Sequence, residues 1–200
     1  MYNFVAAEED KDKKEKEAPA ASGIGEKLFK ARTLFICGEI DQKLAKEFMM
    51  QLVALADESE DDITIYLNSQ GGHVEAGDTI HDIIRFVKPR VKIVGTGWVA
   101  SAGTHIYLSV PKEDRFSLPN TRFLIHQPMG GVGGRASDIK IEAEEIVKMR
   151  RRLNEIIAKQ TGQPLKRVEE DTQRNYWMTA SQAIEYGIAG KIIESIDELK

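Results

Sequence analysis

The 200-residue sequence has a single cysteine, Cys37, and no long uninterrupted apolar segment. One cysteine excludes a disulfide within the chain, which fits a reducing compartment. No window reaches the ~18 to 20 apolar residues that a membrane-spanning helix needs, and the N-terminus lacks the basic start and apolar core of a signal peptide. The sequence therefore predicts a cytoplasmic protein with no membrane partner. Because Cys37 lies in the apolar run LFICGEI, we expect it to be an inert residue of the core.

An excess of positive charge is also missing. The formal net charge is −4 and the pI is about 5.7. Binding to nucleic acid requires a basic face, so no nucleic-acid partner is predicted. What the chain does have is 42% hydrophobic residues, which is enough for one domain with a sizeable core.

The N-terminal stretch differs in composition from the rest of the chain. Residues 8–17 are all charged and are followed by the stretch APAASG. A segment of this kind has too little apolar surface to offset the entropy cost of ordering it. We therefore predict a charged, disordered N-terminal segment over residues 1–24 and a single domain over residues 25–200.

Strand-like and helix-like runs alternate through that domain. Short apolar runs predict strands at 33–40, 63–68, 91–97 and 122–126. Apolar residues at helical spacing predict helices at 41–58, 76–87, 101–110, 137–162 and 179–187. The expected helix caps are Asp41, Ser137, Gly162, Gly187 and a capping box from Thr179 to Gln182. Alternation of this kind is typical of an α/β fold with a largely parallel sheet.

Three features with chemical potential lie where predicted strands end. Ser101 follows the run VKIVGTG and opens a helix, His126 ends the run RFLIH, and the pair Gly71–Gly72 follows ITIYLN. Reactive groups gather at such strand ends in α/β folds. A serine needs a base to become a nucleophile, histidine suits that task near neutral pH, and glycine amides can point at a carbonyl oxygen. The arrangement is consistent with an acyl-transfer site.

Each of these features also has a purely structural explanation. A serine at a helix start commonly caps the helix, a histidine at a strand end is commonly a hydrogen-bonded core residue, and QGG is commonly a turn. Several other chemistries are not predicted. The residue two before Ser101 is a valine, so the G-x-S-x-G elbow is missing. The remaining histidines, His73, His81 and His105, lack metal-ligand spacing. The run GGVGG at 130–134 lacks the Lys and Ser/Thr of a phosphate loop.

Four motifs together resemble one known family. The segments IYLNSQGG, GWVASAGTHIYLS, RFSLPNTRFLIHQPMGG and DTQRNYWMTASQAIEYGI occur in that order. They resemble the proteolytic subunit of the Clp protease, and the similarity runs from about Leu28 to Ile196. The resemblance implies a single-domain crotonase-like fold with a protruding handle, formed by a helix at about 137–160 and an adjoining strand.

The same resemblance implies the roles of individual residues. Ser101 matches the family's nucleophilic serine and His126 its histidine, and the amides of Gly71 and Ala102 match its oxyanion hole. It also implies assembly into two stacked heptameric rings around a chamber, either as a homo-oligomer or as mixed rings with a paralogous subunit. A separate AAA+ unfoldase would feed unfolded proteins into the chamber and use ATP, so no cofactor is expected in this chain.

The sequence departs from the family at the catalytic acid. The family's acid lies at the end of a D-x-R-D element. The stretch at 171–175 reads DTQRN here, so Asn175 stands at the position of that Asp. In addition, Gln70 replaces a Pro in the element SQGG, and Gln173 replaces the acidic residue before Arg174. An Asn can orient the histidine but cannot offset the imidazolium with a full charge. In serine proteases with a Ser-His-Asp triad, replacing the Asp by Asn costs roughly 10⁴-fold in turnover. Asp171, one helical turn before Asn175, is an alternative acid. The predicted triad is therefore Ser101, His126 and Asn175, and a weakly or conditionally active serine endopeptidase is expected.

Two other functions remain open at this stage. Asn175 and Gln173 also fit a regulatory or structural ring subunit that works beside an active paralogue. An acyl-CoA enzyme of the wider crotonase superfamily would share the fold and a backbone oxyanion hole, but it does not require a Ser–His pair.

Overall fold

The computed structural model describes residues 19–199, which form one α/β domain with a mainly parallel sheet. Within these residues the strands are β1 (Thr33–Ile40), β2 (Ile63–Gly72), β3 (Val91–Ala100), β4 (Arg115–Ser117), β5 (Arg122–Ile125), β6 (Tyr176–Thr179) and β7 (Lys191–Ile192). The helices are α1 (Pro19–Lys30), α2 (Gln42–Glu58), α3 (Val74–Phe86), α4 (Ala102–Tyr107), α5 (Ala136–Thr161), α6 (Leu165–Asp171) and α7 (Ala180–Tyr186). Two short 3₁₀ turns are η1 (Lys112–Asp114) and η2 (Ile196–Leu199). The α/β class expected from the alternating sequence pattern is confirmed.

The sheet divides at β3. Its order is β1-β2-β3-β4-β7, and β5 also pairs with β3 and carries β6. Residues Ile93–Gly95 of β3 pair with β4, whereas Trp98–Ala100 pair with β5. All these pairings are parallel except the one between β5 and β6. The end of β3 therefore leads to a place where two branches of the sheet meet.

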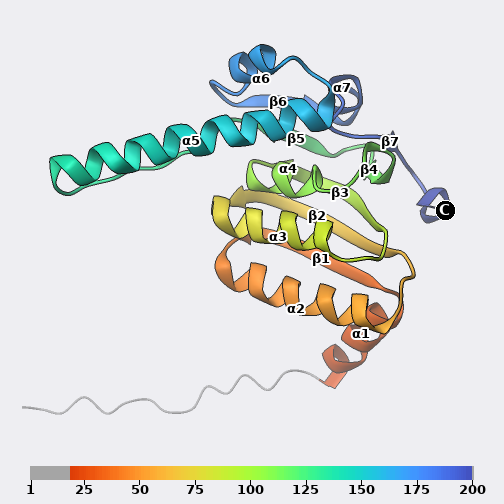
Figure 1. The fold of residues 1–200 in the computed structure, drawn as a ribbon. Helices are drawn as coiled ribbons and strands as arrows, with labels where there is room; N and C mark the ends of the chain where they lie inside the picture. The colour runs from red at the N-terminus through yellow and green to blue at the C-terminus, as the bar shows by residue number, and fades with distance from the viewer. Residues whose placement is uncertain (1–18, 200) are drawn as a thin grey trace, which may run out of the picture.

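Helices α2, α3 and α4 cover the apolar side of β1, β2 and β3, and α3 lies between the other two (Figure 1). In each helix the apolar positions that recur every three to four residues are buried, as in Phe48, Leu52 and Leu55 of α2. Alternate residues of β2 are buried in the same way. The core formed by these contacts holds the end of β3 in a fixed place.

Most of the expected helix caps are confirmed. Asp41 accepts from the amide of Leu44 at 2.7 Å, Thr179 heads the capping box of α7, and Gly162 ends α5 in the left-handed conformation with φ of 76°. The expected cap Ser137 is wrong. Helix α5 begins at Ala136, a strong helix former that extends the helix ahead of the serine.

The expectation that Cys37 is a core residue is also wrong, because its side chain is exposed. Successive side chains of a strand point to opposite faces. In β1 the buried positions include Ile36 and Ile40, so Cys37 lies on the other face of the strand. An apolar run of eight residues does not by itself show which face of a strand is covered.

The predicted boundary at residue 24 stays a prediction. Residues 1–18 lie outside the described residues, and helix α1 runs across the expected boundary. Helix α5 projects far beyond the rest of the fold, as expected for a handle (Figure 1). The residues between β5 and α5 pair with no strand in the described chain, so a handle strand there would need a partner from a second chain. In the described residues no helix combines the length and apolar character needed to span a membrane.

Candidate active site

Ser101 lies at the turn between β3 and α4. Its amide donates to Leu124 O at 3.0 Å, which continues the pairing of β3 with β5 by one residue. Its backbone then turns to φ 56° and ψ −119°, so that the chain leaves the sheet and enters the helix. For a residue other than glycine such a conformation costs on the order of 1–3 kcal/mol and is typical of functional positions. Although Ser101 occupies the N-cap position, its side chain makes no capping hydrogen bond. The capping explanation therefore does not account for this serine.

The backbone of β2 lies directly against Ser101. A Cβ atom on Gly71 would come within 2.6 Å of Ser101 Cβ and 2.8 Å of Ala100 O, and the φ of Gly71 is +99°. Only glycine fits this position, because a side chain would meet both steric and conformational strain. The amide of Gly71 donates to Ser69 Oγ at 3.0 Å, and that hydroxyl in turn donates to Gly38 O. The Gly71 amide is thus beside the serine but engaged by a neighbour.

Ala102 supplies the other predicted oxyanion donor. It is the first residue of α4, and the first amides of a helix have no acceptor within the helix. These free amides give the helix start a partial positive charge that favours an anion. The Ala102 amide thus has no acceptor within its helix, whereas the Gly71 amide is engaged by Ser69.

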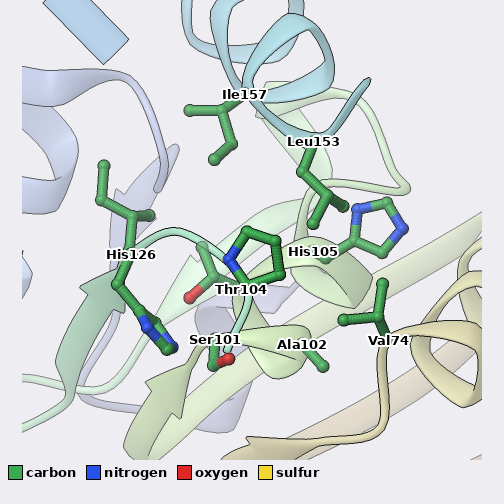
Figure 2. Close-up of a pocket in the computed structure, with 10 residues that line it drawn as sticks. Val74, Ser101, Ala102, Thr104, His105, His126, Leu153 and Ile157 are labelled. Carbon is green, nitrogen blue, oxygen red and sulfur yellow. The ribbon is translucent and has the colours of Figure 1, made fainter. Parts of the chain in front are cut away.

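His126 directly follows β5 and lines a pocket together with Ser101. Figure 2 shows the His126 imidazole and the Ser101 hydroxyl at the same end of this pocket. Burial lowers the pKa of His126, because a charged imidazole loses its hydration there. A neutral imidazole at neutral pH is the state that a general base needs. Across residues 19–199, however, no hydrogen bond joins the side chains of Ser101 and His126.

Asn175 lies one residue before β6. Because β5 and β6 pair antiparallel with Ile125 opposite Tyr176, one further step along the ladder brings Asn175 opposite His126. The Asn175 side chain is exposed and, among the described residues, has no hydrogen-bond partner. The sheet thus brings the third predicted residue next to the histidine without fixing its amide.

The alternative acid, Asp171, is engaged elsewhere. Its Oδ2 accepts from the Tyr186 hydroxyl at 2.9 Å and lies 3.5 Å from Arg167 Nε. These contacts tie the end of α6 to α7. Asp171 is therefore a packing residue of this region, and Asn175 remains the better placed neighbour of His126.

The pocket beside Ser101 is walled mainly by apolar side chains. These are Val74, Ala102, Ile125, Pro128, Leu153 and Ile157. Thr104 also lines the pocket, but its hydroxyl is committed to Val99 O and Leu124 O, each at 2.8 Å. A mainly apolar lining with a few polar groups is typical of pockets that take part of a substrate.

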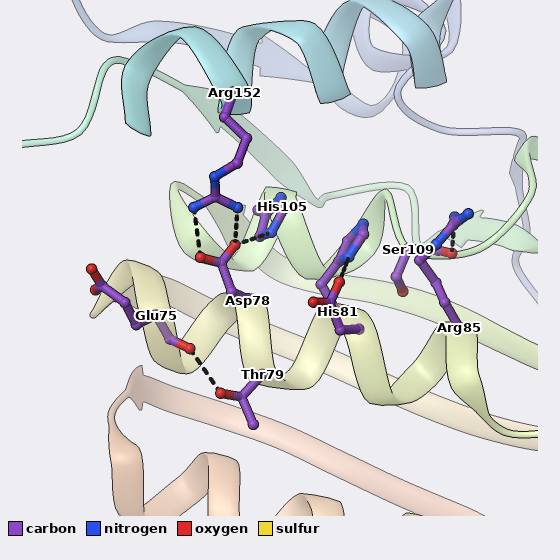
Figure 3. Close-up of polar contacts among 9 residues, drawn as sticks. Glu75, Asp78, Thr79, His81, Arg85, His105, Ser109 and Arg152 are labelled. Carbon is purple, nitrogen blue, oxygen red and sulfur yellow. Dashed lines mark hydrogen bonds and ion pairs between the residues drawn. The ribbon is translucent and has the colours of Figure 1, made fainter. Parts of the chain in front are cut away.

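A polar cluster behind the pocket was missed by sequence reasoning. His105 lines the pocket, and its Nε2 lies 2.9 Å from Asp78 Oδ1. Arg152 of α5 donates to both Asp78 oxygens, at 2.8 and 2.7 Å (Figure 3). His105 lies in α4, four residues after the N-cap position Ser101. This spacing of about one helical turn is the signal that could have placed His105 at the site.

The charges in this cluster are well defined. Burial alone would raise the pKa of Asp78, but hydrogen bonds and charge interactions with His105 and Arg152 lower it well below its usual value. The ring of His81 stacks on His105 with 4.4 Å between centroids and 7° between planes. Asp78 is thus a carboxylate that joins α3, α4 and α5 behind the pocket.

In the part of the chain that the structure describes, no three or more His, Cys, Asp or Glu side chains are grouped as metal ligands. The expectation that the chain carries no cofactor stays a prediction.

The chain is thus a mixed α/β domain with a mainly parallel sheet and with a serine and a histidine at one pocket. Residues 15–196 match the family model described as Clp protease, and the chain belongs to this family. The family membership expected from the four sequence motifs is therefore confirmed, and it removes the basis for the acyl-CoA alternative.

Several relatives and solved structures are similar over most of the chain. The ATP-dependent Clp protease proteolytic subunit 3 of Rhizobium johnstonii is 56% identical over 188 residues, covering 94% of this chain and 97% of the relative. The proteolytic subunit 2 of Gluconobacter oxydans is 56% identical over 176 residues, covering 87% of this chain and 79% of the relative. Among solved structures, ClpP1 from Listeria monocytogenes is 55% identical with a TM-score of 0.81, and an Asn-to-Asp mutant of it gives 0.84; each comparison covers 88% of this chain and 99% of the other.

Proposed function

We propose that this chain is a serine endopeptidase subunit of a Clp-type protease, with Ser101 as nucleophile and His126 as general base. One observation supports this assignment most strongly. Ser101 holds a strained backbone at a strand-to-helix turn, yet its hydroxyl does not cap the helix and opens into a pocket shared with His126. A strained backbone at a residue whose side chain does not cap the helix is expected where the hydroxyl must be presented to a substrate.

The proposed reaction is acyl transfer from a peptide. Ser101 Oγ attacks the carbonyl carbon while its proton passes to His126, and the resulting oxyanion is held by backbone amides. The tetrahedral species collapses as His126 gives the proton to the leaving amine, which breaks the peptide bond. Water, deprotonated by His126, then hydrolyses the acyl-enzyme and restores Ser101.

Two features of the site support low or conditional activity. The Ala102 amide is ready for the oxyanion, whereas the Gly71 amide must exchange Ser69 Oγ for it. Asn175 can orient His126 through its carbonyl oxygen but offers no full charge to the imidazolium. Rearrangement of the β2 end in an assembled ring would free the Gly71 amide, and ordering of the residues before β6 would let Asn175 orient His126, but the missing charge would remain. We therefore expect the isolated chain to be a poor peptidase.

The remaining parts of the proposal concern partners. We propose that the chain works in the cytoplasm in stacked heptameric rings, alone or mixed with a paralogous subunit. An AAA+ unfoldase would deliver unfolded proteins and hydrolyse the ATP, so this chain would need no cofactor. The names of the relatives support this part of the proposal, because they describe proteolytic subunits of an ATP-dependent protease.

Labelling of the nucleophile tests the proposal directly. The purified protein, alone and mixed with a candidate paralogue, is treated with a fluorophosphonate, and the labelled residue is located by mass spectrometry. We expect labelling at Ser101 that the Ser101→Ala variant abolishes. We also expect Asn175→Asp to raise peptidase turnover, by up to roughly 10⁴-fold if the lost charge is the main defect.

The outcomes separate this function from its main alternative. Labelling at Ser101 in any assembly supports the peptidase. Its absence in every assembly, with no gain from Asn175→Asp, would favour a regulatory or structural ring subunit beside an active paralogue. The specific observation behind that alternative is that, within residues 19–199, no hydrogen bonds link Ser101, His126 and Asn175.

A further inference from the structure

Besides the proposed catalytic pair Ser101 and His126, the pocket has one lining residue, His105, with a polar atom that no contact within the fold engages. Its remaining lining residues are aliphatic, except for Thr104, whose hydroxyl lies 2.8 Å from each of two backbone carbonyls. His105 is different because only one of its ring nitrogens is engaged, the Nε2 that faces Asp78. Figure 2 shows its ring at the far end of the pocket from His126, on the side of Leu153.

The contacts of His105 determine which nitrogen carries the proton. Asp78 is a carboxylate and can only accept a hydrogen bond, so Nε2 of His105 is the protonated nitrogen. In the neutral imidazole the other nitrogen, Nδ1, has a free lone pair and can accept a hydrogen bond. Arg152 holds both oxygens of Asp78, and the parallel ring of His81 fixes the plane of the imidazole. The orientation of this acceptor is therefore set before any substrate arrives.

We propose that His105 is a specificity-determining residue, which favours a hydrogen-bond donor on the substrate side chain next to the cleaved bond. This inference rests on the proposed function, since it assigns that side chain to the pocket beside Ser101. A primary amide, as in Asn or Gln, can donate to Nδ1. Leu and Met have nearly the same shapes but would leave the acceptor buried without a partner.

The size of the preference follows from that missing hydrogen bond. Burying an acceptor without a donor is costly, and sites built to bond a substrate group discriminate against analogues that lack it. Because the pocket is partly open, we expect a preference of about five- to tenfold for Asn over Leu and for Gln over Met. Asp78 and Arg152 act through His105 and are positioning residues.

The first measurement is binding of product peptides to the assembled protein. The peptides are identical except for a C-terminal Asn, Leu, Gln or Met, and their affinities are measured by displacement of a fluorescent peptide. This readout needs no catalysis, so it remains informative even if Ser101 is never labelled. The second measurement is the ratio of kcat/KM for peptides with the same residues before the cleaved bond.

His105→Leu should bring both ratios to about one, whereas His105→Gln, which keeps an acceptor, should preserve part of the preference. His73→Leu is the matched control, because His73 lies outside the pocket and is exposed. An affinity for Leu equal to or above that for Asn in the wild-type protein would overturn the proposal, whether or not the His105 variants fold. Unchanged ratios in a folded His105→Leu protein would do the same.

Discussion

At the scale of single residues, His81 has a buried polar atom without a hydrogen-bond partner. Its Nε2 is buried without a hydrogen-bond partner, while Nδ1 lies 3.1 Å from Asp82. Burial and the neighbouring His105 lower the pKa of His81, and Arg85 acts in the same direction, whereas Asp82 opposes them. The folded state therefore binds a proton at this site less readily than the unfolded chain does.

This imbalance predicts a pH-dependent stability. Above the unfolded pKa of about 6.5 both states are neutral here, and as pH falls below it the unfolded state gains protons first, so stability falls. His81→Phe keeps the stacked ring and removes both the unpaired atom and the titration. We expect a gain of about 1 kcal/mol at pH 7 and a larger gain at pH 5, measured as thermal unfolding of the two proteins across this range. An equal shift at every pH would contradict the prediction, and His73→Phe at an exposed position is the control.

The residues of the candidate site differ in how far the sequence could reveal them. Ser101 and His126 were identified because their types and their places after strands are both readable in the sequence. His105 was missed because its partner Asp78 lies 27 residues earlier in the chain, and Arg152 meets Asp78 only after α5 packs. Cys37 was misplaced because apolar neighbours do not report which face of an edge strand is covered.

At the scale of elements, Arg115 joins pieces that are far apart in the chain. It is only 1% exposed. Its guanidinium donates to Val110 O at 2.8 Å and to Gln160 O at 3.0 Å, and it reaches the carbonyls of Gly187 and Ile188 at 3.5 Å. Burial lowers its pKa to about 10, so it stays charged at neutral pH. One side chain thus ties β4 to the end of α5 and to the turn after α7.

Loss of this side chain should destabilise the whole domain. Arg115→Met would fill the space but leave several buried carbonyls without donors, and we expect a loss of at least about 3 kcal/mol. Urea denaturation followed by circular dichroism measures it. Arg115→Lys should fall in between, because an ammonium cannot span the same set of carbonyls. A loss of less than about 1 kcal/mol for the Met variant would show that water replaces these bonds.

The elements predicted from sequence were those with a long periodic pattern. Helices α2, α3 and α5 span 17, 13 and 26 residues, and their apolar spacing was sufficient to identify them. The strands β4 and β7 have three and two residues and exist through pairing with β3 and with each other. Pairing between distant segments leaves little trace in a short stretch of sequence, so these strands were not predicted.

At the scale of the whole molecule, the branching of the sheet at β3 gives the site its position. Parallel β4 and β5 share one strand as a neighbour, and Ser101 follows the residue at which the pairing with β5 ends. Sequence alone predicts strands but not which branch each one joins, because both branches satisfy the same local pattern. The family resemblance supplied the fold class and the handle, whereas the branching of the sheet was not predicted.

The first half of α5 is the part of the molecule that the single chain leaves uncovered. It projects beyond the fold in Figure 1, and Ile139, Ile141 and Val147 on it are 40%, 57% and 66% exposed. Exposed apolar residues on a protruding helix are expected to be buried by another copy of the chain or by a paralogue. We predict that Ile141→Glu combined with Val147→Glu reduces the native mass of the assembly, measured by analytical ultracentrifugation, while the circular dichroism of the domain is unchanged. Ser137→Glu, an added charge at an exposed polar position of the same helix, should leave the mass unaltered. If the double variant keeps the full mass, the handle does not carry the contact between rings and assembly must depend on the faces of the domain itself.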